Sequence, residues 1–262
     1  MTGRTLTATF PAAGWAIPAS TVSAGRYLLR FARTEADLEN VLRLRFAVYH
    51  LEHHIGRADG HSSGLDEDDF DQRFHHLLIE DRDSREVVGT YRMQTAEMAA
   101  DGGYASAELF DLDALPDAVR GMAVEAGRAC IAKGHRNSRV LHLLWRGMAS
   151  YLAWNRKTVV FGSCALPSQD QTLALTVHRH LEKLGASHPS LRVSPLPHAE
   201  CRTPAVVPFR DHRIPDLFQA YLTLGAKLLG PPAVDRDFKT VNWLVLLDVN
   251  DLDQPTYRSF FR

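Results

Sequence analysis

One acidic and one basic side chain, Glu125 and Arg128, stand in an apolar run that is typical of a strand, residues 122–131. A primary amine with a pKa of about 8 is mostly protonated at neutral pH. It must therefore lose a proton before it can attack an acyl group. A carboxylate, acting directly or through a water molecule, is a suitable base. The same pattern also fits an ordinary ion pair between Glu125 and Arg128, so the residues alone leave both interpretations open.

The spacing of Glu125 and Arg128 predicts an irregularity in that strand. Side chains three positions apart in a regular strand point to opposite faces. A β-bulge near Gly127 would change this, and it would also free a backbone amide for the oxyanion of a thioester. We therefore predict a bulge near Gly127.

A polar loop, residues 133–138, follows this strand and opens a predicted helix, residues 139–153. The first amides of a helix lack intrahelical acceptors, and the helix dipole makes this end attractive to anions. Arg136 and Arg139 add full positive charge, and a guanidinium group can fork onto a phosphate. The loop therefore predicts a phosphate-bearing ligand, with a solvated basic loop as the alternative.

Three other clusters offer weaker signals. His50, His53 and His54 have a helical spacing that could bind zinc, but no fourth ligand is evident, so we predict no metal. The acidic residues 66–71 lack the spaced glycine and distal glutamate of a calcium loop. They favour recognition of a cationic or amine acceptor, with a solvated acidic turn as the alternative. Cys130 is predicted to pack in the core rather than act as a nucleophile.

Composition excludes several classes of protein. The chain has 262 residues, of which 45% are hydrophobic and 23% charged, and its formal net charge is −1. This net charge gives no support for a nucleic-acid partner. The three cysteines are odd in number and widely spaced, which favours a reducing compartment. No apolar run approaches the roughly 20 residues of a membrane helix. We expect a cytoplasmic protein, with peripheral contact to the inner face of a membrane left open.

The order of the predicted elements indicates the fold. Strand 27–32, a helix that starts at a capping box on Thr34, strands 76–80 and 86–93, strand 122–131, helix 139–153 and strand 158–164 follow one another. Helices 168–184 and 215–229 and strand 240–249 come after them. This order predicts an α/β protein, an α+β sandwich with helices on a twisted sheet. We expect a partly ordered leader (1–25), a core (26–166) and a C-terminal elaboration packed on it (167–262).

The strand–loop–helix resembles the acyl-donor site of the GNAT acyltransferase superfamily. A set of segments in order resembles one branch more specifically: residues 43–49, 69–71, 76–78, 88–92, 125–128 and 140–147, then 220–226 and 235–240. That branch holds the ornithine-lipid acyltransferases (often labelled hemolysin-like), the N-acyl amino acid synthases and, more distantly, the acyl-homoserine-lactone synthases. The resemblance implies a GNAT-like twisted mixed sheet flanked by helices.

The resemblance also implies a reaction and a set of site residues. The reaction is transfer of a long-chain fatty acyl group from acyl carrier protein to the α-amine of an amino acid, ornithine or similar. Acyl-ACP or acyl-CoA is a substrate, so no cofactor is implied. Glu125 and Arg128 fall on catalytic positions. The implied donor-binding residues are Ile131, His135, Arg136, Asn137, Ser138, Arg139 and Val140. The implied acceptor-binding residues are Arg45, Asp69, Asp71, Arg92, Asp235 and Asp237, although the last two could simply cap a turn.

Other functions remain open from the sequence. An acetyl-CoA-dependent acetyltransferase would share the loop, and an acyl-homoserine-lactone-type signal synthase would share the charged residues. A non-catalytic acyl-carrier or lipid-binding module is the alternative from another class. Four basic residues form either a surface for an acidic carrier protein or a solvated face: Arg139, Arg146, Arg156 and Lys157. The tail aromatics Tyr257, Phe260 and Phe261 could contact a membrane or a second copy of the chain.

Overall fold

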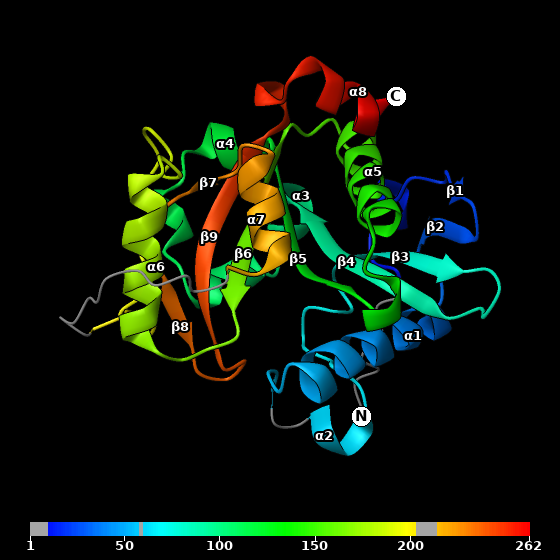
Figure 1. The fold of residues 1–262 in the computed structure, drawn as a ribbon. Coiled ribbons are helices and arrows are strands. Elements are labelled where there is room, and N and C mark those ends of the chain that lie inside the picture. The colour runs from blue at the N-terminus through cyan, green and yellow to red at the C-terminus, as the bar shows by residue number, and fades with distance from the viewer. Residues whose placement is uncertain (1–9, 58–59, 203–213) are drawn as a thin grey trace, which may run out of the picture.

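A nine-stranded mixed sheet runs through the described part of the chain, residues 10–57, 60–202 and 214–262 of this computed structural model (Figure 1). The strand order is β1-β2-β3-β4-β5-β6-β9-β7, and β8 also pairs with β9. The strands are β1 (Val22–Ala24), β2 (Tyr27–Phe31), β3 (His75–Asp81), β4 (Val87–Thr95), β5 (Ala123–Ile131), β6 (Val159–Leu166), β7 (Lys227–Leu228), β8 (Ala233–Asp235) and β9 (Thr240–Asp248). The predicted hairpin, central strands and last strand are confirmed.

Helices cover both faces of the sheet. They are α1 (Glu35–Phe46), α2 (Gly60–Ser63), α3 (Ala96–Ala99), α4 (Asp117–Gly121), α5 (Ser138–Trp154), α6 (Gln171–Lys183), α7 (Asp216–Thr223) and α8 (Gln254–Phe261). A π-helical turn, Ala47–Glu52, prolongs α1. The predicted capping box is confirmed, since Thr34 Oγ1 accepts from Asp37 N and the Asp37 carboxylate accepts from Thr34 N.

Alternation along β3 assigns α1 and α5 to opposite faces. Leu77 packs in the core cluster that contains the α5 residues Leu143 and Leu144. Its neighbour Leu78 packs with Val41 of α1. Successive strand residues point to opposite faces, so α5 and α1 sandwich this half of the sheet. The twisted mixed sheet with flanking helices confirms the predicted fold class.

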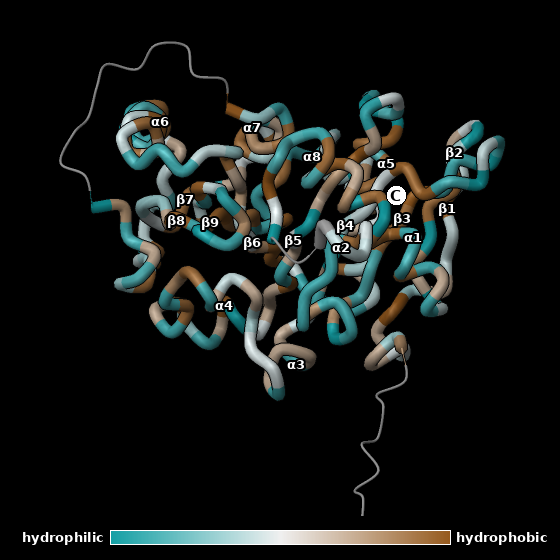
Figure 2. Tube along the Cα trace, turned by 90° about the horizontal axis from the view of Figure 1, so that it is seen from below, coloured by the Kyte–Doolittle hydropathy of each residue, from teal (hydrophilic) through white to brown (hydrophobic). Residues whose placement is uncertain are grey.

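Residues 167–262 extend the same sheet. Strand β9 pairs with β6 along its length, from Val159↔Asp248 to Leu166↔Val241. Helix α6 covers this half with Ala174, Val177 and Leu181, and its coil alternates between hydrophilic and hydrophobic colours in Figure 2. The predicted C-terminal elaboration is thus built around strands that continue the core sheet.

One predicted helix end is wrong. The predicted helix 215–229 ends at Thr223, because Gly225 adopts a left-handed conformation with φ of +97° and turns the chain into β7. In the predicted leader, residues 1–9 lie outside the described residues. Its later part holds a 3-10 turn, Gly14–Ala16, and β1, which pairs with β2.

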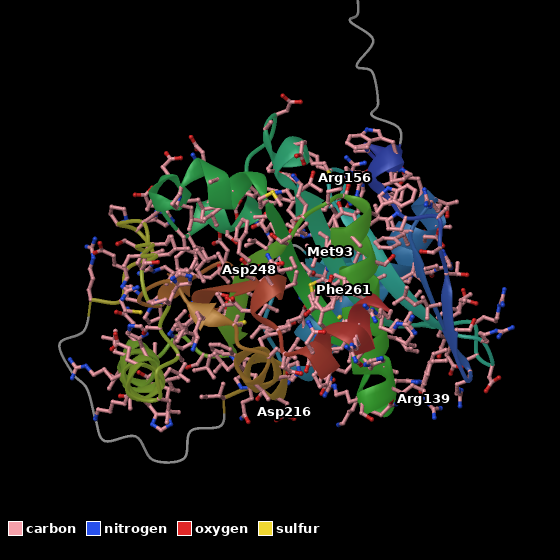
Figure 3. The ribbon with its side chains drawn as sticks, turned by 90° about the horizontal axis from the view of Figure 1, so that it is seen from above. Met93, Arg139, Arg156, Asp216, Asp248 and Phe261 are labelled. Atoms are coloured by element: carbon pink, nitrogen blue, oxygen red, sulfur yellow. The ribbon has the colours of Figure 1, made fainter. Side chains whose placement is uncertain are left out.

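The tail aromatics pack on α5. Phe260 stacks edge-on against Trp145, with ring centroids 5.3 Å apart, and Phe261 packs against the cluster that contains α5. Figure 3 shows Phe261 beside this helix. Tyr257 stacks on Phe261 at 4.5 Å. These half-buried side chains therefore have partners within their own chain.

Strands β5 and β6 form a fork. They pair in parallel only from Ala123↔Val159 to Glu125↔Phe161, although they continue to Ile131 and Leu166. Just beyond the last pair the two backbones still lie close together. A Cβ added at Gly162 would lie 2.0 Å from the carbonyl oxygen of Ala126. The fork therefore requires the absence of a side chain at position 162.

We expect Gly162→Ala to destabilise the protein. The added methyl meets backbone rather than a flexible side chain, and such overpacking costs about 1–3 kcal/mol. The measurement is the free energy of unfolding from urea titrations. Gly121→Ala is the matched control, because a Cβ there meets nothing within 4 Å. Equal unfolding midpoints for the two variants would contradict the assigned role of Gly162.

Candidate active site

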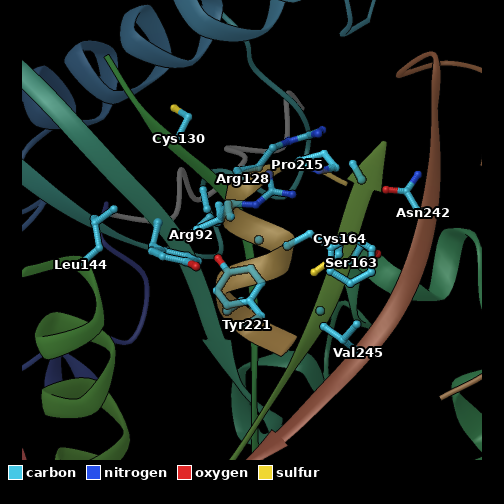
Figure 4. A pocket seen from close by; sticks show the side chains of 18 of the residues that line it. Arg92, Arg128, Cys130, Leu144, Ser163, Cys164, Pro215, Tyr221, Asn242 and Val245 are labelled. Atoms are coloured by element: carbon cyan, nitrogen blue, oxygen red, sulfur yellow. The ribbon is translucent and has the colours of Figure 1, made fainter. Parts of the chain in front are cut away.

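A cavity of about 840 Å³ occupies the fork between β5 and β6. Strand β5 lines it from Glu125 to Ile131, and β6 lines it from Val160 to Leu166. Leu144 and Met148 of α5 and Phe218 and Tyr221 of α7 add apolar walls. Figure 4 shows Arg92 and Arg128 on one wall, with Tyr221 of α7 and Cys164 and Val245 on others. The cavity is therefore charged on one side and apolar along much of its length.

The predicted bulge near Gly127 is confirmed. Gly127 pairs with Arg92, but the next pair is Cys130 with Thr90, so Arg128 and Ala129 together oppose Tyr91. Arg128 has φ of +49°, in the left-handed region, which is strained for a residue with a side chain. Ala129 packs toward the α5 cluster, whereas Arg128 reaches Asp68, as Arg92 does. The bulge thus brings Arg128 to the face that carries Arg92 and, two residues along β4, Gln94.

Glu125 sits at the closed end of the fork and is 2% exposed. Its carboxylate accepts hydrogen bonds from Gln94 Nε2 at 2.8 Å, from Ala105 N at 3.0 Å and from Ser106 N at 2.6 Å. Two of these bonds reach Oε2 and one reaches Oε1. Because a carboxylate oxygen can accept two hydrogen bonds, Oε1 retains capacity for a proton or a water. The alternative ion pair with Arg128 is not formed, since Arg128 donates to Asp68 instead.

A buried network of arginines and aspartates stands beside Glu125. Arg45 donates to Asp66 at 2.7 Å and to Asp71 at 2.6 Å. Arg92 bridges Asp71 at 2.9 Å and Asp68 at 2.5 Å. Asp68 also accepts from Arg128 Nη2 at 2.9 Å. The charges are compensated in pairs, which is the condition under which buried ions are tolerated.

Only part of this network faces the cavity. Asp68, Arg92 and Arg128 line it, whereas Arg45 and Asp71 are 0% exposed and lie behind them. Burial alone would raise the pKa of Asp71, but the guanidinium groups of Arg45 and Arg92 outweigh it and hold the pKa well below its usual range. Arg45 and Asp71 therefore support the charged wall from within, whereas the sequence predicted both as acceptor-binding residues.

The acidic run is placed differently from the prediction. Asp68 lines the cavity, whereas the predicted Asp69 is exposed outside it. Asp235 lines the cavity and also caps its turn, with Oδ1 accepting from Phe238 N at 2.8 Å. The predicted Asp237 is exposed. Glu108, which the sequence did not single out, lines the same mouth, and burial followed by the charge of Asp68 raises its pKa.

The end of β5 and the segment that opens α5 border the cavity. Ile131, Arg136, Asn137 and Ser138 line it. Asn137 caps α5 by accepting from Val140 N at 3.1 Å. This leaves the cap and first helical residue, Asn137 and Ser138, facing the cavity at the positive end of the helix dipole.

The predicted basic ligands beside these residues are engaged elsewhere or lie outside the cavity. Arg136 borders the cavity, but its two terminal nitrogens donate to both carboxylate oxygens of Glu52 at 2.6 and 2.7 Å. Arg139 is exposed, and its guanidinium group lies beside Gly25. A Cβ atom added at Gly25 would be 3.1 Å from Arg139 Nη1. His135 lies 3.1 Å from Tyr27 Oη. Val140 is fully buried in the core.

The remaining candidates have packing roles. Cys130 is buried against Leu44 and Val48, and burial raises the pKa of its thiol to about 12, so it stays protonated. His50 Nε2 lies 3.2 Å from Asp66 Oδ1.

In the described ranges, no group of three or more His, Cys, Asp or Glu side chains is placed to hold a metal ion. None of the described helices is long and apolar enough to cross a bilayer.

The basic residues that could meet a carrier protein do not form one surface. Figure 3 shows Arg139 and Arg156 at opposite ends of α5. Lys157 is buried and donates to Glu97 and to the carbonyl oxygen of Gly121. Arg139 thus lies at the start of α5, beside the predicted donor loop, while Arg156 and Lys157 follow the other end of the helix.

Comparison with known proteins agrees with this geometry. Residues 44–146 match the acetyltransferase (GNAT) domain. This range contains β3, β4, β5, Glu125 and the first half of α5. This part of the chain is therefore similar to a GNAT acyltransferase domain, and it contains one strand of the fork described above.

Two curated relatives extend the similarity to nearly the whole chain. An L-ornithine Nα-acyltransferase of Rhodobacter capsulatus is 29% identical over 250 residues, covering 90% of this chain and 94% of that protein. An L-ornithine Nα-acyltransferase of Rhizobium meliloti is 27% identical over 241 residues, covering 85% of this chain and 80% of that protein. Among solved structures, the N-acyl amino acid synthase FeeM from uncultured soil microbes shares the fold. It has a TM-score of 0.52 and 11% identity, covering 90% of this chain and 94% of that one.

Sequence reasoning missed several residues of the site. Gln94 could have been found, because it lies two positions after Arg92 and therefore on the same strand face. Asp68 could not be separated from Asp69 within a continuous acidic run. Ala105 and Ser106 act through backbone amides, which carry no signal in the residue type. Phe238, whose ring lies 4.0 Å beneath the guanidinium of Arg128, required the tertiary structure.

Proposed function

We propose that this protein transfers a long-chain fatty acyl group from acyl carrier protein to the α-amine of an amino acid, ornithine or similar. The observation that carries the proposal is the position of Glu125, an acceptor-only carboxylate at the closed end of a large, mainly apolar cavity. The near full-length similarity to two L-ornithine Nα-acyltransferases supports this acceptor.

The charged wall suits an amino-acid acceptor. Arg92 and Arg128 line the cavity and can donate to the acceptor's carboxylate. Asp68, Glu108 and Asp235 line the same mouth and can pair with ammonium groups. An acceptor with one carboxylate and two amino groups matches both signs of charge, which supports ornithine over an uncharged amine.

The apolar walls suit a long acyl chain. Ligand cavities for molecules of drug size measure about 300–1,000 Å³, and the fork cavity, at about 840 Å³, lies in the upper part of that range. Leu144, Met148, Phe161, Phe218 and Val245 contribute to its apolar lining. An acetyl group would leave most of this surface uncovered, which favours a fatty acyl group over the acetyl-CoA alternative.

The proposed reaction needs one base and a positioned thioester. The donor's phosphate lies at the start of α5, near Asn137 and Ser138, and its arm follows the open edge of β5 toward Glu125. Glu125 takes one proton from the ammonium group, directly or through a water, and passes it to solvent; the neutral amine nitrogen then bonds to the thioester carbon. The C–S bond breaks as the tetrahedral intermediate collapses, and the second proton of the nitrogen passes to the leaving thiolate. The products are an N-acyl amino acid and a free thiol.

Lipid extracts from cells that express the protein test this proposal. We expect mass spectrometry to detect a new N-acyl amino acid with a long acyl chain, absent from cells that express Glu125→Ala. Purified protein with acyl carrier protein charged with hexadecanoate and ornithine should give the same product. Detection of N-acetylated amines instead, or of no new N-acyl product with several charged carriers, would overturn the proposal.

A further inference from the structure

Tyr91 places a hydroxyl group in the wall of the cavity. It lies in β4 directly opposite the bulge, where Arg128 and Ala129 share one partner position. Its side chain is 3% exposed, packs in the cluster that contains Leu144, and borders the cavity. Its Oη atom is buried and has no hydrogen-bond partner among the residues that the structure describes.

A buried hydroxyl without a hydrogen-bond partner is unusual for tyrosine. Buried tyrosine hydroxyls normally find a partner, because the group loses its bonds to water when it is buried. Tyr151 of the same chain follows this rule, with Oη 2.8 Å from His75 Nδ1. The uncompensated hydroxyl of Tyr91 borders an open cavity, so a bound molecule can supply the missing acceptor.

The position of Tyr91 identifies which substrate supplies that acceptor. Arg92, the next residue, points to the face that carries the charged wall, so Tyr91 points to the face covered by α5. The donor loop opens α5 on that face, and Ile131, Asn137 and Ser138 line the cavity there. An arm that runs from Ser138 to Glu125 follows β5, the strand that pairs with Tyr91's own strand. Carbonyl oxygens are the hydrogen-bond acceptors that such an acylated arm carries.

We propose that Tyr91 Oη donates a hydrogen bond to a carbonyl oxygen of the donor's acyl-pantetheine arm. The inference rests on the proposed function, since it requires an acyl thioester in this cavity. Tyr91 then positions the donor rather than removing a proton. The bond replaces the one that the hydroxyl lost on folding, so it forms without breaking an internal contact.

Tyr91→Phe tests this role with binding and stability measured together. The probe is hexadecanoyl-CoA, and its Kd is measured by isothermal titration calorimetry. We expect the Kd to rise about tenfold, equivalent to about 1.4 kcal/mol. We also expect the melting temperature of the ligand-free variant to rise by about 2 °C, because the variant buries no unpaired hydroxyl.

A thioether analogue separates the two kinds of carbonyl. S-hexadecyl-CoA lacks the thioester carbonyl but keeps the amides of the pantetheine arm. If Tyr91 bonds the thioester, wild type and Tyr91→Phe bind this analogue equally. If Tyr91 bonds an amide, the tenfold difference persists. Either result supports donation to the acyl-pantetheine arm. Comparison of the two ligands shows whether the acceptor is the thioester oxygen or an amide oxygen.

Tyr151→Phe is the matched control. It removes a buried hydroxyl that already has a partner and does not border the cavity. We expect it to lower the melting temperature and to leave the Kd for hexadecanoyl-CoA unchanged.

Equal Kd values of wild type and Tyr91→Phe for hexadecanoyl-CoA would overturn the role of Tyr91 while leaving the proposed function intact. A lower melting temperature for Tyr91→Phe would also overturn it, because it would reveal an internal partner for the hydroxyl. If wild type binds neither hexadecanoyl-CoA nor the charged carrier protein, the proposed function is overturned together with this inference.

Discussion

Glu125→Gln is expected to lower kcat by about 10²–10⁴-fold, the usual contribution of a general base. Donor affinity should stay close to wild type, because glutamine has nearly the size of glutamate and the proposed donor contacts lie along β5 beyond residue 125 and at the start of α5. The glutamine can no longer accept the proton of the amine, and its amide group also meets donors from Ala105 and Ser106. Single-turnover kinetics with charged carrier protein, together with donor titrations, measure both effects.

The pH dependence separates a base from a purely structural carboxylate. At a pH above the amine pKa of about 8, the acceptor is already deprotonated and needs no base. The ratio of wild-type to Glu125→Gln activity should therefore shrink as the pH rises. A ratio that is constant with pH would mean that Glu125 only holds residues 105 and 106 in place. Glu80→Gln, at a buried glutamate of β3, controls for the substitution itself.

Asp71→Ala is expected to lower the free energy of unfolding by about 3–5 kcal/mol. Asp71 is fully buried and accepts from both Arg45 and Arg92. Removal of its carboxylate leaves two buried guanidinium groups with less compensation than they need. Because Arg92 lines the cavity, activity should fall as well. Urea titration of wild type and variant measures the change.

The control for Asp71 is an aspartate at the surface. Asp83 forms an exposed ion pair with Arg26 at 3.2 Å, and such pairs contribute about 0–1 kcal/mol. Asp83→Ala should therefore change the unfolding midpoint little. If Asp71→Ala proves as stable as Asp83→Ala, the network does not depend on Asp71.

We expect strong acid to destabilise the protein through the same network of arginines and aspartates. The folded-state pKa of Asp71 is depressed by Arg45 and Arg92, which overcome the opposing effect of burial. A carboxylate with a depressed pKa contributes stability that is present above its unfolded value of 3.8 and is lost as the pH falls through the folded value. The contribution of this group is therefore complete at neutral pH and declines only in strong acid.

Local signals predicted most of the fold. The capping box at Thr34, the hairpin of β3 and β4, and the strand–loop–helix around Glu125 are short-range patterns, and each was confirmed. The predicted helix 215–229 ended at Thr223, six residues early, because Gly225 in the left-handed region stopped it before the second glycine, Gly230, was reached. A pattern of apolar residues does not reveal which of two nearby glycines ends a helix.

The sequence by itself determined the elements, the bulge after Gly127 and the presence of a carboxylate at position 125, because these depend on neighbours along the chain. Only the tertiary structure decided which groups meet. It chose Asp68 over Asp69 for the cavity, paired Arg136 with Glu52, gave Glu125 the amides of residues 105 and 106, and left Tyr91 without a partner among the described residues. Each of these outcomes depends on strand register and on which side chains are buried together. Residues far apart in the chain become neighbours only in the folded protein, so the sequence does not show which of them will pair.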